Sequence, residues 1–309
     1  MRHTDRLRPG RVPLHAFAGA ILVLAGEALI IAHHRPVSDY YFPFAWFGYT
    51  LVLDGALKTQ TGTSLWSDRR GLFAALLCLS VGFWWLFELF NVAVRNWVYV
   101  GAQSYSGLSY VAFASIDFSL VLPAVWTSSL FVVSLLPPGA ARTRLRAVPK
   151  PLLAALLVAG AACISLPVLF PGYAFGLIWL CMFFLLDPIN YLLGRPSIVA
   201  ELWSGHFGPA LSFAAGALMC GFFWEAWNYW AMPKWTYDIP HVGFWHVFEM
   251  PLLGWSGYLP FGLELFAMTN FVLPLIGLGT LALDVRATGG AARERTPAPG
   301  ESPDRRRAS

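Results

Sequence analysis

Two short stretches each combine one carboxyl group, one side-chain amide and several aromatic rings within apolar sequence. The first contains Glu88 and Asn91, and the second contains Glu225 and Asn228. Residues three apart share one face of a helix, so each Asn can hydrogen-bond its Glu. A carboxyl group positioned in an apolar wall is a candidate general acid. We therefore interpret Glu225 and Glu88 as candidate catalytic residues, oriented by Asn228 and Asn91.

Aromatic side chains surround both acids and are candidates for a substrate-binding wall. The candidates are Trp224, Trp227, Trp235 and Tyr237 in the second stretch and Trp97 in the first. Aromatic faces attract cations by roughly 0.5–2 kcal/mol each. The alternative interpretation is an ordinary interfacial belt of Trp and Tyr, with both acids reaching headgroups or water.

Three further acids lie inside apolar segments. Glu264 is the deepest, about 18 Å into the last apolar segment at 1.5 Å per residue, and it is a second candidate proton donor. For Glu27 we expect a structural role. Asp117 has two open interpretations, because it lies in the fourth predicted helix and Arg95 follows the third, so an ion pair between them could account for it without chemistry.

Signals for metal or cofactor chemistry are weak. His241, His246 and Glu249 share one loop, and whether they bind a metal is left open, although two or three ligands on a loop are a weak signal. We expect no metal and no cofactor. The chain has no Gly-rich phosphate loop, no HExxH pattern and no nucleophile elbow, which argues against hydrolysis and phosphoryl transfer.

The composition is typical of a membrane protein with several spans. Hydrophobic residues make up 57% of the chain, charged residues 12%, and the mean hydropathy is +0.57, whereas soluble domains carry about 25% charged residues. Apolar runs of about 18 residues can cross a bilayer. We predict an all-α fold with about eight transmembrane helices, near residues 14–33, 40–57, 71–95, 108–137, 151–170, 173–190, 207–230 and 252–283. At the inner ends of two of them, Asp54 and Asp187 are expected to cap helices or contact headgroups.

The distribution of positive charge predicts the orientation of these helices. If the N-terminus is cytoplasmic, all of the 21 Lys and Arg residues except Arg35, Arg95 and Lys234 fall on the cytoplasmic side. The positive-inside rule then places both termini in the cytoplasm and the chain in the inner membrane. This topology explains the net charge of +4, so no nucleic-acid partner is expected. Whether the protein forms a homo-oligomer is left open.

The chain also contains an internal repeat. Glu225 and Asn228 each follow their counterparts Glu88 and Asn91 by 137 residues. Four helices per half give both halves the same orientation, related by an axis along the membrane normal. The predicted parts are a cytoplasmic segment 1–13, a first four-helix repeat 14–137, a cytoplasmic linker 138–150, a second repeat 151–284 and a disordered cytoplasmic tail 285–309.

The second half resembles a known enzyme family. Its motifs are Glu225-x-x-Asn228, then Trp235-x-Tyr237, then Pro260-x-x-x-Glu264-x-Phe266. They are similar to those of the membrane-embedded lycopene cyclase domain of fungal bifunctional and bacterial two-subunit enzymes. The Trp-Glu-x-Trp-Asn motif is also similar to that of other bacterial integral membrane proteins. The cyclase resemblance implies paired small helical units and a protonated carboxyl group that starts cyclisation of a polyene without a cofactor.

These observations favour one function and leave two alternatives. The favoured function is an integral membrane enzyme that acts on an isoprenoid, polyene or other lipid by carboxyl-initiated acid–base chemistry, as a cyclase or isomerase. Its partner would be a membrane lipid or isoprenoid substrate. The first alternative is a proton- or cation-coupled transporter or channel, in which the buried acids relay charge. The second alternative is an accessory membrane subunit without catalytic activity.

Overall fold

A computed structural model describes residues 11–35, 37–136 and 146–281, and the chain there is mostly helical. The predicted tail and most of the predicted linker and N-terminal segment lie outside these residues. The α-helices and strands are α1 (Leu14–Ala32), α2 (Tyr41–Thr61), α3 (Leu65–Asp68), α4 (Arg70–Val94), β1 (Trp97–Val100), α5 (Gly107–Phe118), α6 (Val121–Leu135), α7 (Lys150–Leu169), α8 (Pro171–Ala174), α9 (Cys181–Leu192), α10 (Ile198–Trp203), α11 (Gly208–Trp230), β2 (Lys234–Tyr237), β3 (His246–Val247), β4 (Met250–Pro251) and α12 (Tyr258–Val272). The short 3-10 helices are η1 (Val37–Tyr40), η2 (Ala102–Ser104), η3 (Phe175–Trp179), η4 (Leu252–Gly257) and η5 (Leu273–Ile276).

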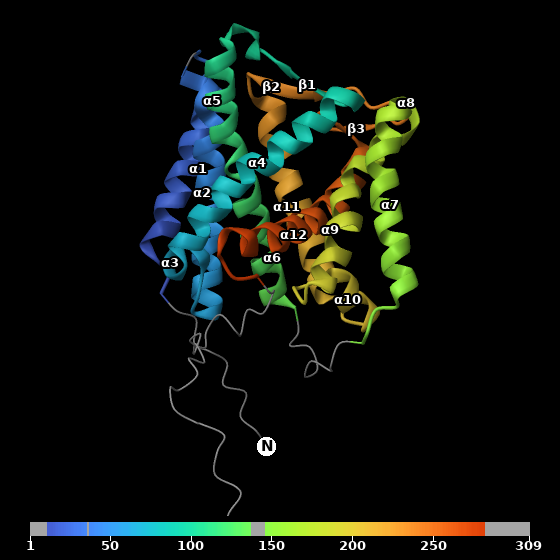
Figure 1. Ribbon diagram of the computed structural model, residues 1–309. Helices are drawn as coiled ribbons and strands as arrows, with labels where there is room; N and C mark the ends of the chain where they lie inside the picture. Colours follow the sequence, from blue (N-terminus) through green and yellow to red (C-terminus); the bar gives the residue numbers. More distant parts are fainter. Residues whose placement is uncertain (1–10, 36, 137–145, 282–309) are drawn as a thin grey trace, which may run out of the picture.

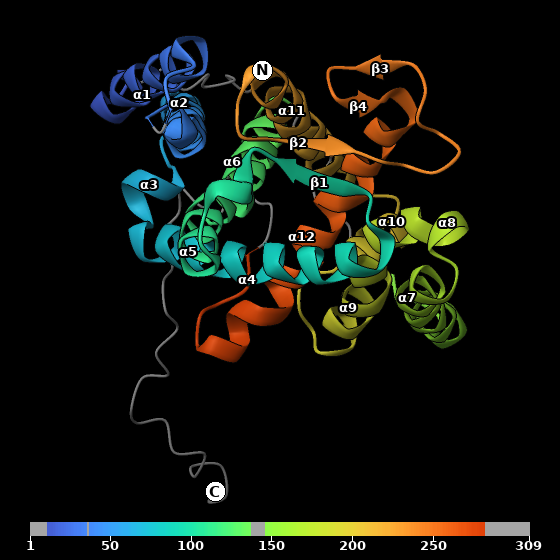
Figure 2. The same ribbon diagram turned by 90° about the horizontal axis from the view of Figure 1, so that it is seen from above.

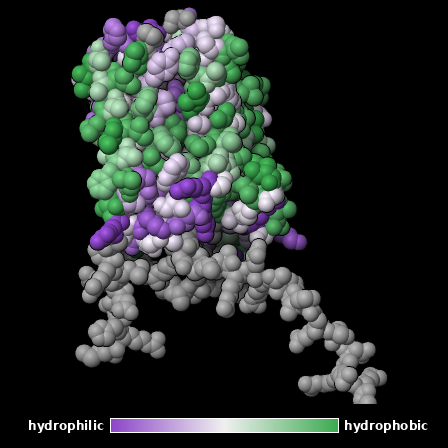
Figure 3. Space-filling model, turned by 90° about the vertical axis from the view of Figure 1, so that its left-hand side faces the viewer, coloured by the Kyte–Doolittle hydropathy of each residue, from purple (hydrophilic) through white to green (hydrophobic). Residues whose placement is uncertain are grey.

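The helices confirm a multi-pass membrane protein. Within the described residues, seven helical segments are long and apolar enough to cross a membrane. On the face that Figure 3 shows, the surface is mostly apolar in its middle, and hydrophilic residues are concentrated towards its two ends. The seven segments are 14–32, 70–94, 107–135, 150–169, 171–192, 208–230 and 252–276.

The predicted span near 40–57 is a helix but is not among these seven. It forms α2, a helix of 21 residues that includes the charged residues Asp54 and Lys58. This helix packs between α1 and α6, and Asp54 is fully buried. Because many of its side chains face protein instead of lipid, α2 does not need the uniformly apolar sequence of a lipid-facing helix.

Three predicted spans are interrupted where the sequence predicts continuous helices. The run 108–137 breaks between α5 and α6, 173–190 divides into α8, η3 and α9, and 252–283 contains η4, α12 and η5. Pro123 and Pro260 are the third residues of α6 and α12. Proline fits the first turn of a helix, where its missing N–H has no acceptor to lose, but it disrupts a helix interior. The two helices therefore begin just before these prolines.

Small residues bring α1 and α2 into close contact. A Cβ atom added at Gly48 of α2 would lie 2.6 Å from the Gly19 carbonyl oxygen and 2.7 Å from the Val23 amide nitrogen. Close approach through glycine is a common way for helices to pack in membranes, where van der Waals contact replaces the hydrophobic effect.

Substitution of Gly48 tests this packing. We expect Gly48→Ala to lower the free energy of unfolding by about 1–3 kcal/mol, because the new methyl group must displace backbone atoms. Gly82→Ala in α4 is the matched control, since nothing lies within 4 Å of its added Cβ, and we expect it to be neutral or stabilising. Thermal unfolding of both variants in detergent is the measurement. An equal loss in both would contradict the tight contact between α1 and α2.

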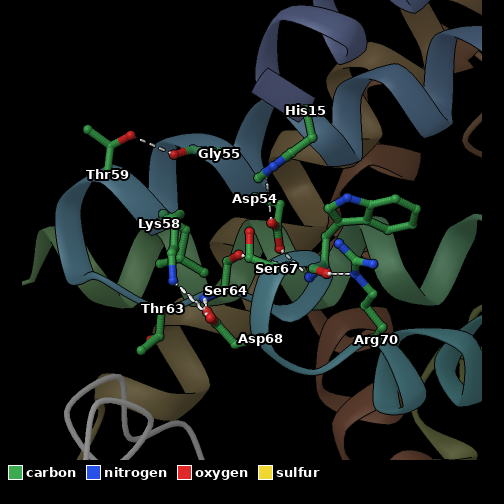
Figure 4. A network of polar contacts seen from close by, with 12 residues as sticks. His15, Asp54, Gly55, Lys58, Thr59, Thr63, Ser64, Ser67, Asp68 and Arg70 are labelled. Atoms are coloured by element: carbon green, nitrogen blue, oxygen red, sulfur yellow. Dashed lines mark hydrogen bonds and ion pairs between the residues drawn. The ribbon is translucent and has the colours of Figure 1, made fainter. Parts of the chain in front are cut away.

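At the end of the molecule opposite the strands, two buried aspartates cap short helices. Asp187 accepts hydrogen bonds from the Ser197 hydroxyl and from the Ile198 and Val199 amides at the start of α10. Asp54 accepts one from the Trp66 amide in α3, and its other carboxyl oxygen lies 3.1 Å from a ring nitrogen of His15 (Figure 4). The expected capping is confirmed. The expected headgroup contact is wrong, because both aspartates are fully buried.

A two-stranded ribbon closes the other end of the molecule. Strand β1 pairs with β2 in antiparallel register, with Trp97 opposite Tyr237 and Tyr99 opposite Trp235. Figure 2 shows this ribbon from above, lying across the end of the helix bundle. Strand β1 follows α4, and β2 follows α11. The ribbon therefore joins the two stretches that contain the candidate acids.

Candidate functional site

The asparagine of each candidate stretch holds a strand of the ribbon. The Asn228 amide nitrogen donates to the Trp235 carbonyl oxygen at 2.8 Å, and its side-chain oxygen accepts from the Trp235 amide at 2.9 Å. Asn91 makes the same two bonds to Trp97, at 2.8 and 3.3 Å. The interpretation that each Asn orients its neighbouring Glu is therefore wrong. An amide side chain offers one donor and one acceptor direction that match a peptide group, and the strand uses both.

Glu225 is held by tyrosine hydroxyl groups. Its Oε1 accepts hydrogen bonds from Tyr237 at 2.6 Å and from Tyr258 at 2.7 Å. Trp235 donates its indole N–H to the Tyr237 hydroxyl oxygen at 2.9 Å. Glu225 is fully buried, and its Oε2 has no hydrogen-bond partner among the residues that the structure describes. One carboxyl oxygen thus fixes two phenols that belong to different elements, β2 and α12.

Glu88 occupies a similar setting in the first half of the chain. Its Oε1 accepts from the indoles of Trp84 and Trp97 at 3.0 and 3.1 Å and from the Tyr99 hydroxyl at 2.6 Å. Tyr99 lies two residues after Trp97, just as Tyr237 lies two residues after Trp235. In both halves, the order is a helix that carries Glu and Asn, then a strand whose Tyr binds that Glu. Glu88 is only partly buried, so its site is less enclosed than that of Glu225.

A cavity of about 660 Å³ lies beneath the ribbon. We call it the ribbon cavity, and its wall includes Trp97, Tyr99, Trp235 and Tyr237 from the ribbon and Trp224 from α11. This volume is within the range of about 300–1,000 Å³ that is usual for small-molecule sites. Residues of α2, α4, α5, α6, η3, α11 and α12 also contribute to the wall. The cavity therefore lies between the two halves of the chain.

The predicted site residues divide into three groups. Four of the five predicted substrate-binding residues line the ribbon cavity, and these are Trp97, Trp224, Trp235 and Tyr237. The fifth, Trp227, does not line this cavity and packs edge-on against Trp46. The predicted catalytic residues Glu88, Asn91, Glu225 and Asn228 do not line the cavity but lie one layer behind its wall. They position the aromatic residues that do.

Glu264 is separate from this site. Its Oε1 accepts a hydrogen bond from the Met182 amide at 2.9 Å, at the start of α9. A carboxyl group at a helix N-terminus satisfies a backbone donor that has no partner within the helix, and the helix dipole favours its charge. Glu264 is fully buried and does not line the ribbon cavity. Helix capping therefore accounts for the burial of this acid.

The hydroxyl groups of Tyr99 and Tyr237 act as donors. Burial, followed by the neighbouring Glu88 carboxylate, raises the pKa of Tyr99 well above its usual value. Burial and Glu225 likewise raise the pKa of Tyr237. Both phenols therefore keep their protons at neutral pH and donate to the acids behind them.

Alkaline titration tests this assignment. In the folded protein, Tyr99 and Tyr237 should remain neutral through the usual tyrosine range near pH 10. We therefore expect Tyr99→Phe and Tyr237→Phe to leave the tyrosinate absorbance of the folded protein unchanged at about pH 10–11, where exposed tyrosines ionise. After unfolding, each variant should show less tyrosinate absorbance than the parent chain. Because folding raises the pKa of both tyrosines, their protonated phenols contribute stability to the folded protein below about pH 10. That contribution is lost as the pH rises through the pKa of the folded state. A decrease in the folded titration would contradict the donor role.

The polar groups of the cavity wall include residues that sequence reasoning did not identify. Asp39 pairs with Arg35 and accepts a hydrogen bond from Tyr105 at 2.7 Å, and Lys234 pairs with Glu249. Burial and the bond to Asp39 raise the pKa of Tyr105 to about 12. The only sequence signal for these pairs is the four-residue spacing of Arg35 and Asp39.

The possible metal ligands are not gathered together. Among the described residues, no group of three or more His, Cys, Asp or Glu side chains is arranged to hold a metal ion. Glu249, one of the three residues left open as ligands, forms its ion pair with Lys234 instead.

Comparison with known proteins adds no relative. No protein-family model matches the chain, and no curated protein or solved structure shows significant similarity to it. The class of the protein therefore rests on its fold and its site alone. It is a helical multi-pass membrane protein with a cavity rich in aromatic residues.

Proposed function

We propose that this protein is a membrane enzyme that acts on an isoprenoid, polyene or other apolar lipid by acid–base chemistry, as a cyclase or isomerase. The observation that carries this proposal is the ribbon cavity, whose wall is rich in aromatic residues. Trp84, Trp97, Trp179, Trp224 and Trp235 all contribute to it. Such a wall binds an apolar chain and can stabilise a carbocation through the faces of its rings.

In this proposal, Glu225 and Glu88 prepare the site from behind the wall. Glu225 holds the hydroxyls of Tyr237 and Tyr258, and Glu88 holds that of Tyr99. All three tyrosines line the cavity. A fixed set of dipoles around the reacting carbon atoms needs no reorganisation during the reaction, which is a major source of enzymatic rate enhancement.

The finer architecture belongs to the same proposal. We infer two four-helix repeats of the same orientation, eight spans including α2, and both termini in the cytoplasm of a cell whose inner membrane holds the protein. The paired contacts of Asn91 with Trp97 and Asn228 with Trp235 support a duplication. The register of the ribbon also fits, because an axis through the Val98 and Thr236 pair would exchange its two strands.

Lipid analysis tests the proposed function. The chain is produced in bacteria that make lycopene, and their lipid extracts are compared by mass spectrometry with those of cells lacking it. We expect a new polyene isomer of unchanged mass. Trp224→Ala should abolish its formation, whereas Trp227→Ala is the matched control because both side chains are 7% exposed and only Trp224 lines the cavity. No change in any polyene or quinone species would contradict an enzyme of this kind.

A transporter is the second candidate, supported by a different observation. In the half of the molecule away from the ribbon, Thr127, Ser128, Ser129, Ser212 and Thr269 are fully buried. The hydroxyls of Thr127, Ser212 and Thr269 have no hydrogen-bond partner within the described chain. Such groups can bind water or an ion along a path through a membrane protein. Proton flux into liposomes that contain the protein would favour this alternative, and unchanged lipid composition without flux would favour an accessory subunit.

A further inference from the structure

Asp117 is the acid of the ribbon cavity that has no partner among the described residues. It lies on α5 and lines the cavity, and the structure gives it no ion pair or side-chain hydrogen bond in the described ranges. The ion pair with Arg95 that the sequence left open is not formed, because Arg95 is exposed at the end of α4. The other lining acid, Asp39, is occupied by Arg35 and Tyr105.

The depth of Asp117 separates it from the polar ends of the molecule. At 1.5 Å per residue, it lies about 15 Å along α5 from Gly107, which begins that helix at the ribbon end. This distance is about half of a hydrocarbon core roughly 30 Å thick. An ionisable side chain at this depth is costly, and such residues usually serve a function.

The surroundings of Asp117 are aromatic. Tyr41 lies close enough to interact with it electrostatically, and Phe113, Phe118 and Trp84 line the same cavity. Asn96 also lines it, is 3% exposed, and keeps a side-chain oxygen without a partner in the described chain. Lys234 forms its ion pair with Glu249, so it is not the counter-ion of Asp117.

We propose that Asp117 is the catalytic residue that touches the substrate and exchanges a proton with one of its carbon–carbon double bonds. This proposal deepens the proposed function and rests on it. Unlike Glu225, Glu88 and Glu264, Asp117 lines the cavity. A residue must lie within hydrogen-bond reach of the atom that it protonates, so geometry selects it over the three glutamates.

The proposed step conserves atoms and electrons. The Asp117 carboxyl group gives its proton to one alkene carbon, and the π electron pair becomes the new C–H bond. The neighbouring carbon becomes a carbocation, and the carboxylate keeps the negative charge. A second double bond of the same chain then attacks the cation and closes a ring. The carboxylate finally removes a proton from a carbon beside the new cation, which restores a double bond and the acid. The product is an isomer of the substrate, so the step requires no oxidant or reductant.

The first experiment measures contact without needing turnover. The purified full chain is treated in detergent with dicyclohexylcarbodiimide, an apolar reagent that adds to carboxyl groups, and labelled peptides are mapped by mass spectrometry. We expect labelling at Asp117. Lycopene at about ten times its Kd should lower that labelling about tenfold, because only one site in about eleven stays free. Labelling of Glu225 or Glu264 in place of Asp117, or labelling that lycopene does not change, would overturn the proposal.

The second experiment measures proton transfer. Lycopene is incubated with the protein in D2O, and we expect the isomeric product to carry deuterium. Asp117→Asn should lower the rate by at least about 100-fold, as for the loss of a general acid. Glu27→Gln on α1 is the matched control and should react normally, because Glu27 does not line the cavity. Size-exclusion chromatography verifies that both variants are folded.

The outcomes distinguish the two proposals. If the parent chain converts lycopene and Asp117→Asn does so equally well, the role of Asp117 is wrong and the proposed function stands. If the parent chain does not convert lycopene, the proposed function fails for this substrate. The proton-transfer role of Asp117 then fails with it, and the labelling experiment still decides whether Asp117 contacts a bound polyene.

Discussion

Glu225→Ala is expected to lower the free energy of unfolding by about 2 kcal/mol or more, since it leaves two partly buried phenols without their acceptor at about 1 kcal/mol or more each. The phenols belong to Tyr237 and Tyr258, which donate to one oxygen of a fully buried side chain. Thermal unfolding in detergent, followed by size-exclusion chromatography, measures the loss.

Glu225→Gln separates stability from activity. Glutamine keeps a carbonyl oxygen that can accept both phenols, so we expect most of the stability to return. Lycopene conversion should fall, because a neutral amide positions the hydroxyls with weaker hydrogen bonds than a carboxylate does. Glu27→Ala on α1, where the acid makes no hydrogen bond within the described residues, is the control for both measurements. A variant Glu225→Ala that is as stable as this control would contradict the described contacts.

Asn228→Ala is expected to detach strand β2 and to lower the free energy of unfolding by about 2–3 kcal/mol, since it removes a fully buried side chain and leaves the N–H and C=O of Trp235 without their partners. Asn228 is fully buried, whereas Asn91 is partly exposed. Water can replace the lost side chain at Trp97 more easily, so Asn91→Ala should cost only about 1 kcal/mol.

Hydrogen exchange distinguishes detachment of the strand from general unfolding. In Asn228→Ala, the Trp235 amide should exchange faster, while amides in the middle of α11 should keep their protection. In Asn91→Ala, the faster amide should be that of Trp97. Equal losses of stability in the two variants would show that the difference in burial has no energetic consequence. Unchanged exchange at Trp235 would show that Asn228 does not hold the strand.

The sequence identified the residues around the cavity better than it identified their roles. Trp97, Trp224, Trp235 and Tyr237 were predicted as a wall because aromatic residues clustered near two intramembrane acids, and they do line one cavity. Trp227, predicted as part of the same wall, does not line this cavity. Trp227 lies three residues after Trp224 on α11, so the two side chains are about one helical turn apart. Only the packing of the neighbouring helices decides which of the two lines the cavity.

The roles of the polar residues depended on contacts that are distant in the chain. Spacing alone suggested that Asn228 binds Glu225, because they share a helix face. In the structure, the chain turns back after α11, so Trp235 offers Asn228 a complete peptide group and Tyr237 offers Glu225 a hydroxyl. Glu264 looked like a second acid for catalysis and instead binds the start of α9.

The sequence by itself determined that this is a helical membrane protein, because the cost of burying charge in lipid limits composition along every span. It also marked the two acid and aromatic stretches, because costly residues in apolar runs are visible without coordinates. Only the tertiary structure decided that β1 and β2 join these stretches above one cavity, and that Asp117 faces it while the glutamates stand behind. The physical reason is that hydropathy depends on each residue's own side chain, whereas a hydrogen bond depends on which partner the fold brings within about 3 Å.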